Sequence, residues 1–228
     1  MCPLAIPTLR PKTKSPQPSQ LRLKKPRSKT MFLDPKKKIE KHRWGLPHWH
    51  QDNTLVFVTW RLADSLPTKV VEKLKGQEAD WLACHPKPWD QKIASEHNRK
   101  FILPLEDYLD DCHGSCCLKE HHQIVADALH HFDKERYDLD CFVVMPNHVH
   151  VLFRLKKDHP LADVIHSLKR HTAREINKAL SQTGKLWQSK YWDRLIRSEK
   201  HLDWTRNYIS DNPKNLPKGS FSIWSEGL

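Results

Sequence analysis

Residues 137–155 read YDLDCFVVMPNHVHVLFRL, and they carry the clearest indication of the fold in this sequence. Residues 137–145 and His148–Leu155 are both rich in β-branched and aromatic side chains, which favours strands. Pro146 and Asn147 stand between them and are typical of a tight turn. The stretch therefore predicts two consecutive strands joined by that turn.

The segments on either side of this pair alternate between strand and helix patterns. Prolines at 86, 88 and 104 interrupt residues 85–118, for which no element is predicted. The hydrophobic pattern predicts a strand over 54–62, helices over 67–83 and 119–132, an extended segment over 187–196, and a helix over 199–212 that Pro213 ends.

Residues 161–180 carry a long amphipathic helical pattern, which Gly184 ends. The residues that we expect to face inward are Leu161, Val164, Ile165, Leu168, Thr172, Ile176 and Ala179.

This order of elements predicts an α+β fold of the ferredoxin-like, or split βαβ, type. Such a fold has an antiparallel sheet with helices packed on one face. We expect the other face to be free, and a functional site can lie there.

Charge divides the chain of 228 residues into two parts near residue 44. The formal net charge is +12, and residues 1–43 alone contribute +11, with 13 basic and two acidic residues. These 43 residues also hold seven of the 16 prolines, so we expect a disordered basic tail over 1–43 and a single folded domain over 44–228. The tail can bind nucleic acid electrostatically, or it can simply solubilise the protein.

We expect neither a membrane-spanning nor a secreted protein. No apolar run approaches the roughly 20 residues that a membrane span needs, and no secretory signal pattern opens the chain. The six cysteines then indicate reduced thiols in a cytoplasm.

His148 and His150 are the sharpest chemical feature. Because side chains alternate along a strand, both imidazoles point to one face while Val149 points to the opposite layer. They form half of a metal site, or they are two ordinary surface histidines in a chain with 16 histidines.

A second feature lies on the predicted helix 199–212. Four-residue spacing places Trp204, Tyr208 and Asn212 on one helix face. A phenol and an amide oxygen one turn apart could act as a nucleophile and a metal ligand. The alternative is a buried tyrosine with a bonded hydroxyl and an asparagine that caps the helix. Because Asn212 precedes Pro213, we expect its backbone to leave helical values.

Several segments, taken in order, resemble the REP-associated tyrosine transposases, which are single-tyrosine members of the HUH endonuclease group. The resemblance covers about residues 44–220. It rests on LPHW (46–49), FVTWRLADSLP (57–67), MPNHVH (145–150), LKRHTAREIN (168–177), LWQSKYWDRLIR (186–197) and YISDNP (208–213).

The resemblance implies a metal-dependent, single-stranded DNA endonuclease and strand transferase. By this resemblance, His148, His150 and Asn212 bind Mg²⁺ or Mn²⁺, and Tyr208 is the nucleophile that forms a 5′-phosphotyrosine. The expected substrate is hairpin-forming DNA of REP elements. The expected protein is a monomer or homodimer in a bacterial cytoplasm, associated with the nucleoid. The alternative is a non-catalytic nucleic-acid-binding regulator on the same fold.

Two further groups offer competing interpretations. Tyr191 is a possible nucleophile, but Tyr208 is preferred because a rigid helix joins it to Asn212. Cys112, Cys116 and Cys117 could bind Zn²⁺, yet their spacing is not that of paired zinc ligands, so we interpret them as reduced structural or surface thiols.

DNA contacts are expected from basic residues of the C-terminal third. Arg170, Arg174 and Lys178 recur every four residues, opposite the apolar stripe of their helix, and form either a track for phosphates or a solvated face. Arg194 and Arg197, in a family-like stretch, complete the expected DNA-binding set.

Overall fold

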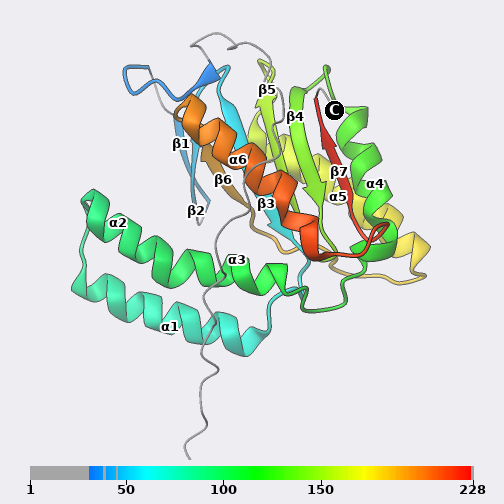
Figure 1. Cartoon of the computed structure of the whole chain (residues 1–228), viewed down its shortest axis with the longest axis horizontal. Coiled ribbons are helices and arrows are strands. Elements are labelled where there is room, and N and C mark those ends of the chain that lie inside the picture. The colour runs from blue at the N-terminus through cyan, green and yellow to red at the C-terminus, as the bar shows by residue number, and fades with distance from the viewer. Residues whose placement is uncertain (1–30, 38–39, 45, 227–228) are drawn as a thin grey trace, which may run out of the picture.

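The computed structural model describes residues 31–37, 40–44 and 46–226 (Figure 1). Its strands are β1 (Glu40–Trp44), β2 (Leu46–His50), β3 (Leu55–Arg61), β4 (Tyr137–Val144), β5 (His148–Leu155), β6 (Trp192–Leu195) and β7 (Ser222–Ser225). Its helices are α1 (Thr68–Cys84), α2 (Gln91–His97), the π-helix η2 (Asn98–Ile102), α3 (Leu103–Asp110), α4 (Leu118–His131), α5 (Leu161–Ala179), α6 (Glu199–Asp211) and the 3₁₀-helix η3 (Asn212–Asn215).

Five strands form the central sheet in the order β6-β3-β5-β4-β7, and every neighbouring pair is antiparallel. The first four of these give the ferredoxin-like order, so the predicted α+β class is confirmed. The turn at Pro146 and Asn147 is also confirmed. Val144 pairs with Val149, and the amide of Met145 donates to the carbonyl of His148 at 2.8 Å.

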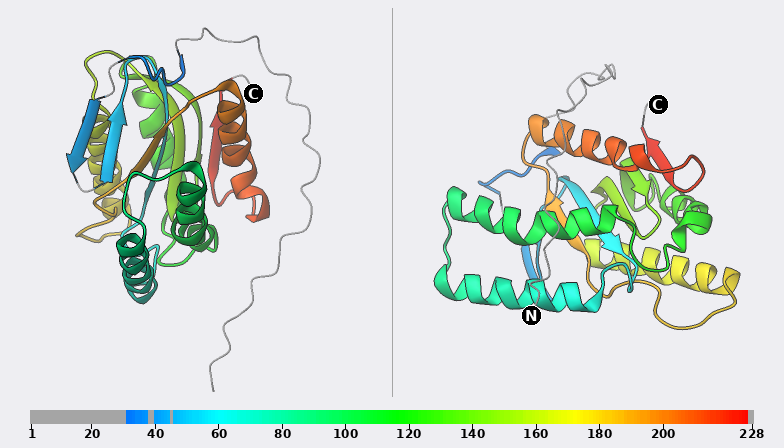
Figure 2. Two further views of the ribbon diagram at one scale, coloured as in Figure 1. Left: turned by 90° about the vertical axis from the view of Figure 1, so that its left-hand side faces the viewer. Right: turned by 60° about the horizontal axis from the view of Figure 1, so that its bottom comes forward.

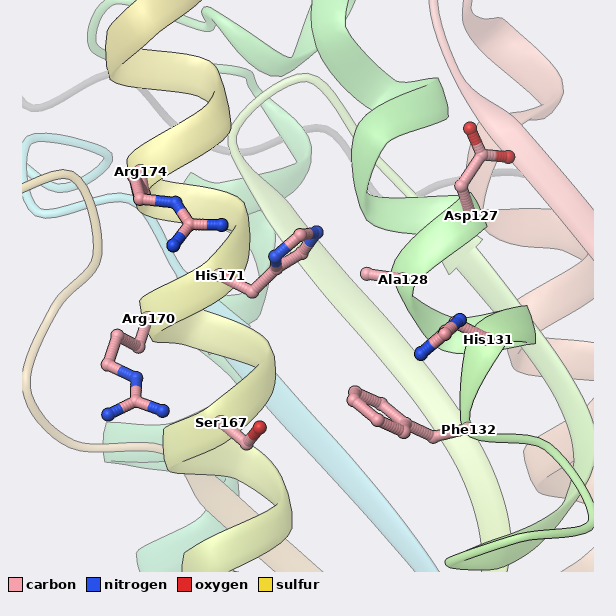
Figure 3. A pocket seen from close by; sticks show the side chains of 8 residues that line it. All are labelled: Asp127, Ala128, His131, Phe132, Ser167, Arg170, His171 and Arg174. Carbon is pink, nitrogen blue, oxygen red and sulfur yellow. The ribbon is translucent and has the colours of Figure 1, made fainter.

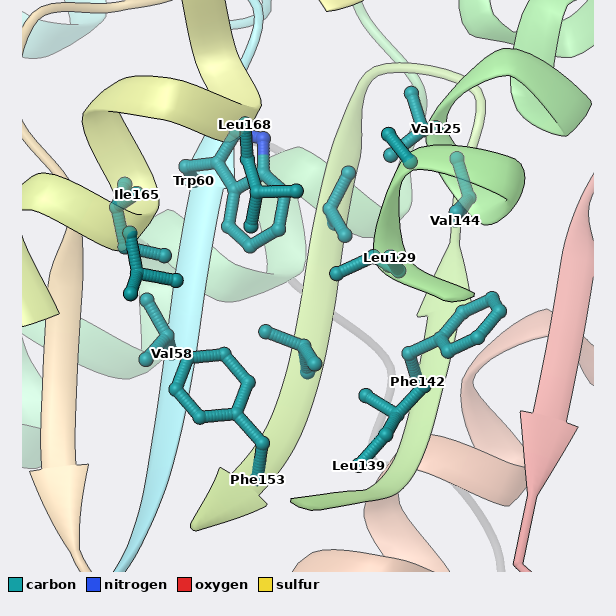
Figure 4. Close-up of a cluster of buried hydrophobic side chains, with 14 of the residues drawn as sticks. Val58, Trp60, Val125, Leu129, Leu139, Phe142, Val144, Phe153, Ile165 and Leu168 are labelled. Carbon is teal, nitrogen blue, oxygen red and sulfur yellow. The ribbon is translucent and has the colours of Figure 1, made fainter. Parts of the chain in front are cut away.

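One face of the sheet is covered by α4 and α5 (Figure 4). Alternate residues of the strands, such as Val58, Val149 and Phe153, meet Leu129 and Ile165 of these helices in a cluster of buried apolar side chains. Six of the seven residues expected to face inward on α5 are buried. The exception is Ala179, which is exposed because it is the last residue of the helix and lies beyond the packed turns.

The opposite face, which was expected to be free, carries α6. Leu202 and Ile209 of this helix pack with Phe57, Val143 and Leu152 in a second apolar cluster. Figure 2 shows α5 and α6 on opposite sides of the sheet. The expectation of helices on one face only was therefore wrong, because the apolar stripe of α6 also needs a buried partner.

Some elements were not anticipated from the sequence. Residues 85–118 contain α2, η2 and α3, which with α1 form a helical hairpin beside the sheet (Figure 1). Trp81 of α1 and Phe101 of η2 are buried there, with their rings 5.9 Å apart. The two-stranded sheet β1–β2 and the edge strand β7 were also not predicted. These strands have only four or five residues, too few to show a hydrophobic period.

Most of the predicted tail, residues 1–30, lies outside the described residues. The described part that follows packs on the domain. Met31 is buried in the cluster beneath α6, and the amide of Leu33 donates to the carbonyl of Ile196 at 2.8 Å. We therefore propose that the folded domain begins by residue 31 and not at residue 44. Among the described residues, no helix has the length and apolar character to cross a membrane.

Candidate metal and nucleophile site

His148 and His150 lie side by side on β5, on the face that α6 covers. Their side chains are buried, with exposed fractions of 0% and 2%, and their ring centroids are 4.6 Å apart. Val149 points into the opposite apolar cluster. The predicted alternation along this strand is thus confirmed, and the interpretation of the two histidines as surface residues is wrong.

The orientation of the His148 ring is set by the turn that precedes it. The amide nitrogen of Asn147 donates to the carbonyl of His113 at 3.2 Å, which leaves its Oδ1 atom facing His148. That oxygen is 2.7 Å from Nδ1 of His148. Because the amide oxygen can only accept, Nδ1 carries the proton and Nε2 keeps a lone pair. The Nε2 atom is buried and has no hydrogen-bond partner.

The ring of His150 is held by the neighbouring strand. Thr59 of β3 is paired with His150 in the sheet, and its hydroxyl oxygen lies 2.7 Å from Nδ1. Phe57 stacks on the ring, with centroids 5.5 Å apart. These contacts hold Nε2 on the side of α6, where it lies 3.5 Å from the hydroxyl of Tyr208.

Burial keeps both imidazoles neutral. Desolvation lowers the pKa of His148 to about 3. Burial, together with the charge that the neighbouring His148 would carry, holds the pKa of His150 well below its usual range. Both rings are therefore neutral near pH 7, which is the form that binds metal ions.

Helix α6 brings Tyr208 to this site, and Asn212 follows one turn later as the C-cap of the helix. The residues expected on its packing side, Leu202, Thr205 and Ile209, are all buried. Asn212 keeps helical φ and ψ values of −56° and −47°, so the expected departure before Pro213 was wrong. The chain continues into η3, where proline in the first turn loses no necessary hydrogen bond.

The donor atoms at this site fit a divalent cation. Oδ1 of Asn212 and Nε2 of His148 are both buried without a hydrogen-bond partner, a costly arrangement that a cation would relieve. Imidazole nitrogens suit Mn²⁺ and the amide oxygen suits both Mn²⁺ and Mg²⁺. In the part of the chain that the structure describes, no group of three His, Cys, Asp or Glu side chains could hold a metal ion. The third ligand that the resemblance implies, Asn212, would supply an amide oxygen.

An aromatic surface extends from Tyr208 to solvent. Trp204, one turn earlier on α6, stacks on Tyr208 with an interplanar angle of 9° and is 54% exposed. On the other side, Phe57 meets Trp192 edge to face, and the guanidinium of Arg194 lies 4.7 Å from the Trp192 ring. Unpaired bases stack on such surfaces.

The structure separates the expected DNA-binding residues into two groups. Arg194 pairs with Phe57 across the sheet and so shares the face of the candidate site, and Arg197 follows β6 and is exposed. Arg170, Arg174 and Lys178 are exposed on α5, on the far side of the sheet. Arg170 and Arg174 border a groove of about 610 Å³ between α4 and α5 (Figure 3). None of the candidate catalytic groups lines this groove.

The competing interpretations lie elsewhere. Tyr191 packs against the apolar cluster under α5, and burial raises the pKa of its hydroxyl. Cys112, Cys116 and Cys117 are thiols, and the Sγ atom of Cys116 donates to the carbonyl of Cys112 at 2.8 Å. Burial raises the pKa of Cys112 to about 11, which disfavours the thiolate that binds zinc.

Three positioning residues were missed by the sequence reasoning. Phe57, Thr59 and Asn147 hold the two imidazoles, but only strand pairing and the turn conformation bring them there. Asn147 belongs to the predicted turn, but an asparagine at a turn predicts only the conformation of the backbone and not where the side chain points.

A sequence model of the family described as "Transposase IS200 like" matches residues 113–212. The matched region includes both histidines, Tyr208 and Asn212, and it confirms the resemblance to tyrosine transposases. Residues 113–212 of this chain are thus similar to the IS200-like transposases. No curated protein matches the chain.

Two solved structures are similar to this chain. One is described as "Structure of the REP associates tyrosine transposase bound to a REP hairpin", with 17% identity, a TM-score of 0.40, and coverage of 70% of this chain and 66% of that chain. This chain thus spans just under two thirds of that protein. The other, from Deinococcus radiodurans R1, is described as a transposase, with 18% identity, a TM-score of 0.30, and coverage of 69% of this chain and 89% of that chain.

Proposed function

We propose that this protein is a metal-dependent, single-stranded DNA endonuclease and strand transferase. The observation that carries the proposal is the position of the Tyr208 hydroxyl, 3.5 Å from Nε2 of His150. A phenol on a helix that packs on the sheet thus meets an imidazole pair on a strand, and both belong to the IS200-like region.

The proposed reaction is a transfer of a phosphodiester to the protein. The oxygen of Tyr208 attacks the phosphorus, a bond to the 5′-phosphate forms, and the 3′-oxygen of the preceding nucleotide leaves and takes up a proton. The reverse attack by a 3′-hydroxyl rejoins DNA and releases the tyrosine. Because the phosphotyrosine conserves the energy of the cleaved phosphodiester bond, rejoining needs no ATP.

The residues that would hold the cation are His148, His150 and Asn212. When bound, the cation neutralises the charge that grows on the phosphate oxygens and orients the scissile bond. A tyrosine hydroxyl has an ordinary pKa near 10 and is a poor nucleophile at neutral pH, so this help is needed. The three donors are neutral and leave charge on the cation for the phosphate.

The same geometry supports attack within one chain. Tyr208 and His150 of the same molecule are already adjacent, so no second subunit is required to supply the nucleophile. The rigid frame of α6 sets the distance between the phenol and Asn212.

DNA that forms hairpins is the proposed substrate, in keeping with the REP hairpin bound in the first similar structure. The exposed ring of Trp204 would stack an unpaired base near Tyr208. The basic ridge of α5 would contact phosphates of a more distant part of the DNA. Because the proposed substrate is DNA, we also propose that the protein lies in the cytoplasm, on the nucleoid.

Covalent adducts provide the test. End-labelled single-stranded hairpin DNA incubated with Mn²⁺ should give a protein–DNA band on a denaturing gel, and Tyr208→Phe should abolish it because no other oxygen replaces the phenol. Tyr191→Phe is the matched control and should keep the adduct. An adduct that survives Tyr208→Phe and disappears with Tyr191→Phe would reverse the assignment. DNA binding without any adduct would instead favour the non-catalytic regulator.

A further inference from the structure

Arg61, the last residue of β3, stands beside the candidate site. It pairs with His148 across the sheet, as Thr59 pairs with His150. Because side chains alternate along a strand, Arg61 lies on the same face as Thr59, whose hydroxyl contacts the ring of His150. Trp60, between them, enters the opposite apolar cluster. An arginine thus belongs to the next cross-strand pair on the face that carries the two histidines.

The guanidinium of Arg61 is anchored through one nitrogen only. Its Nη1 atom donates to the carbonyl of Leu62 at 3.4 Å and to Oγ of Ser65 at 3.0 Å. Within the described part of the chain, no acceptor takes a hydrogen bond from Nε or Nη2, and neither atom is among the buried polar atoms that lack a partner. A ligand can therefore reach these two donors, which form one edge of the planar fork that binds phosphate bidentately.

No carboxylate of the described residues pairs with the half-buried side chain of Arg61, since both of its acceptors are neutral. Two other half-buried arginines differ in this respect. Arg154 donates to Asp138 at 2.6 Å. Arg206 donates to both oxygens of Asp140, at 2.7 and 2.6 Å. Because a charge partly removed from water without a counter-charge costs free energy, an anion bound at Arg61 would offset a cost that the other two arginines do not have.

The turn that Arg61 contacts does not depend on it. The hydroxyl of Ser65 donates to the carbonyl of Leu62 at 2.9 Å, so the two groups that accept from Arg61 also bond to each other. Loss of the guanidinium would leave this bond in place. A cation that the turn does not need, held beside the candidate site, indicates a role toward a ligand.

We propose that Arg61 binds a phosphate of the DNA strand next to the phosphate that Tyr208 attacks, an inference that rests on the proposed nuclease function. The hydroxyl of Tyr208 meets His150, and Arg61 belongs to the neighbouring cross-strand pair, about 7 Å further along the strands. Nε and Nη2 would each donate to one oxygen of that phosphate. Such a contact fixes the register of the strand in the site and reads no base.

Neutralising single phosphates tests this contact. Each phosphate in the single-stranded flank of a labelled hairpin DNA is replaced in turn by an uncharged methylphosphonate, and filter binding measures affinity for the full chain carrying Tyr208→Phe, which cannot cleave. One replacement should weaken binding about 10- to 100-fold when Arg61 is present, the range for a hydrogen bond to a charged group. With Arg61→Gln added, the same replacement should change affinity less than about twofold, because its partner is already missing.

Arg154→Gln is the matched control. It removes the same charge from the other end of the sheet, where Asp138 already offsets it. Arg61→Gln should lower the slope of log affinity against log salt by about 0.7, the value for one contact to single-stranded DNA, and Arg154→Gln should leave the slope unchanged. Equal slopes for Arg61→Gln and wild type, or a methylphosphonate scan that Arg61→Gln does not alter, would overturn the role of Arg61.

A thermal melt separates this role from a structural one. Arg61→Gln should shift the melting temperature by less than about 4 °C, since the turn keeps its own hydrogen bond. A large fall would mean that Arg61 serves the fold and would contradict the proposal. Wild-type protein that forms no adduct with hairpin DNA would instead defeat the proposed nuclease function itself.

Discussion

The two faces of the central sheet are built from the same strands and differ in what their side chains leave unsatisfied. Under α4 and α5, the cluster around Val149 and Phe153 is almost wholly apolar. On the face that α6 covers, the strands also carry the buried His148 and His150, and buried polar atoms of His148 and Asn212 have no hydrogen-bond partner. The first face serves the fold alone, and the second also carries the residues for which we propose a cation site.

The first prediction compares two phenylalanines on opposite faces. Phe153 and Phe57 are both buried, and replacing either with alanine should cost about 3–5 kcal/mol of unfolding free energy, because each leaves a large cavity. Only Phe57→Ala should also weaken Mn²⁺ binding, since Phe57 stacks on His150. Urea unfolding and calorimetry measure the two effects. Loss of Mn²⁺ affinity in Phe153→Ala as well would mean that the faces are not independent.

The second prediction concerns acid and the metal-free protein. Because burial lowers the pKa of His148 to about 3, the unfolded chain takes up a proton near pH 6.5 while the folded chain does not. Stability should therefore fall as the pH drops below 6.5, by about 1 kcal/mol per pH unit from this one group. His148→Gln should flatten the fall between about pH 6.5 and pH 5, above the range where carboxylates titrate. Denaturant melts with chelator present give the slopes, and identical slopes would show that His148 is already charged in the fold.

The smallest effect is expected on the outer surface of α5. Replacing Arg170 and Arg174 with alanine should reduce the salt dependence of DNA binding, with the slope of log affinity against log salt falling by about 1.4 to 1.8. Adduct formation at saturating DNA should be unchanged, because these residues lie across the sheet from Tyr208. Filter binding over a salt series measures the slope. Lys73→Ala with Lys75→Ala removes equal charge from α1 as the control, and an equal loss there would mean that only net charge matters.

Local patterns predicted the elements around the site with small errors at their ends. The strand predicted over His148–Leu155 has those bounds, and the helix expected over 161–180 ends one residue earlier. These segments bury one face or one stripe along their whole length, so the sequence shows their hydrophobic periodicity. The helices within 85–118 could not be predicted in this way, since prolines interrupt them and few of their residues enter a large core.

The candidate site likewise combines relations that the sequence predicts with contacts that only the tertiary structure decides. Strand alternation alone placed His148 and His150 on one face, and helical spacing alone grouped Tyr208 with Asn212, because both relations are local. Only the packing of α6 onto the sheet decided that the phenol meets His150, and only the helical hairpin brought Asp110 to His148. These contacts join residues that are 58 and 38 positions apart in the sequence. Hydrophobic periodicity does not indicate which distant surfaces pack against each other.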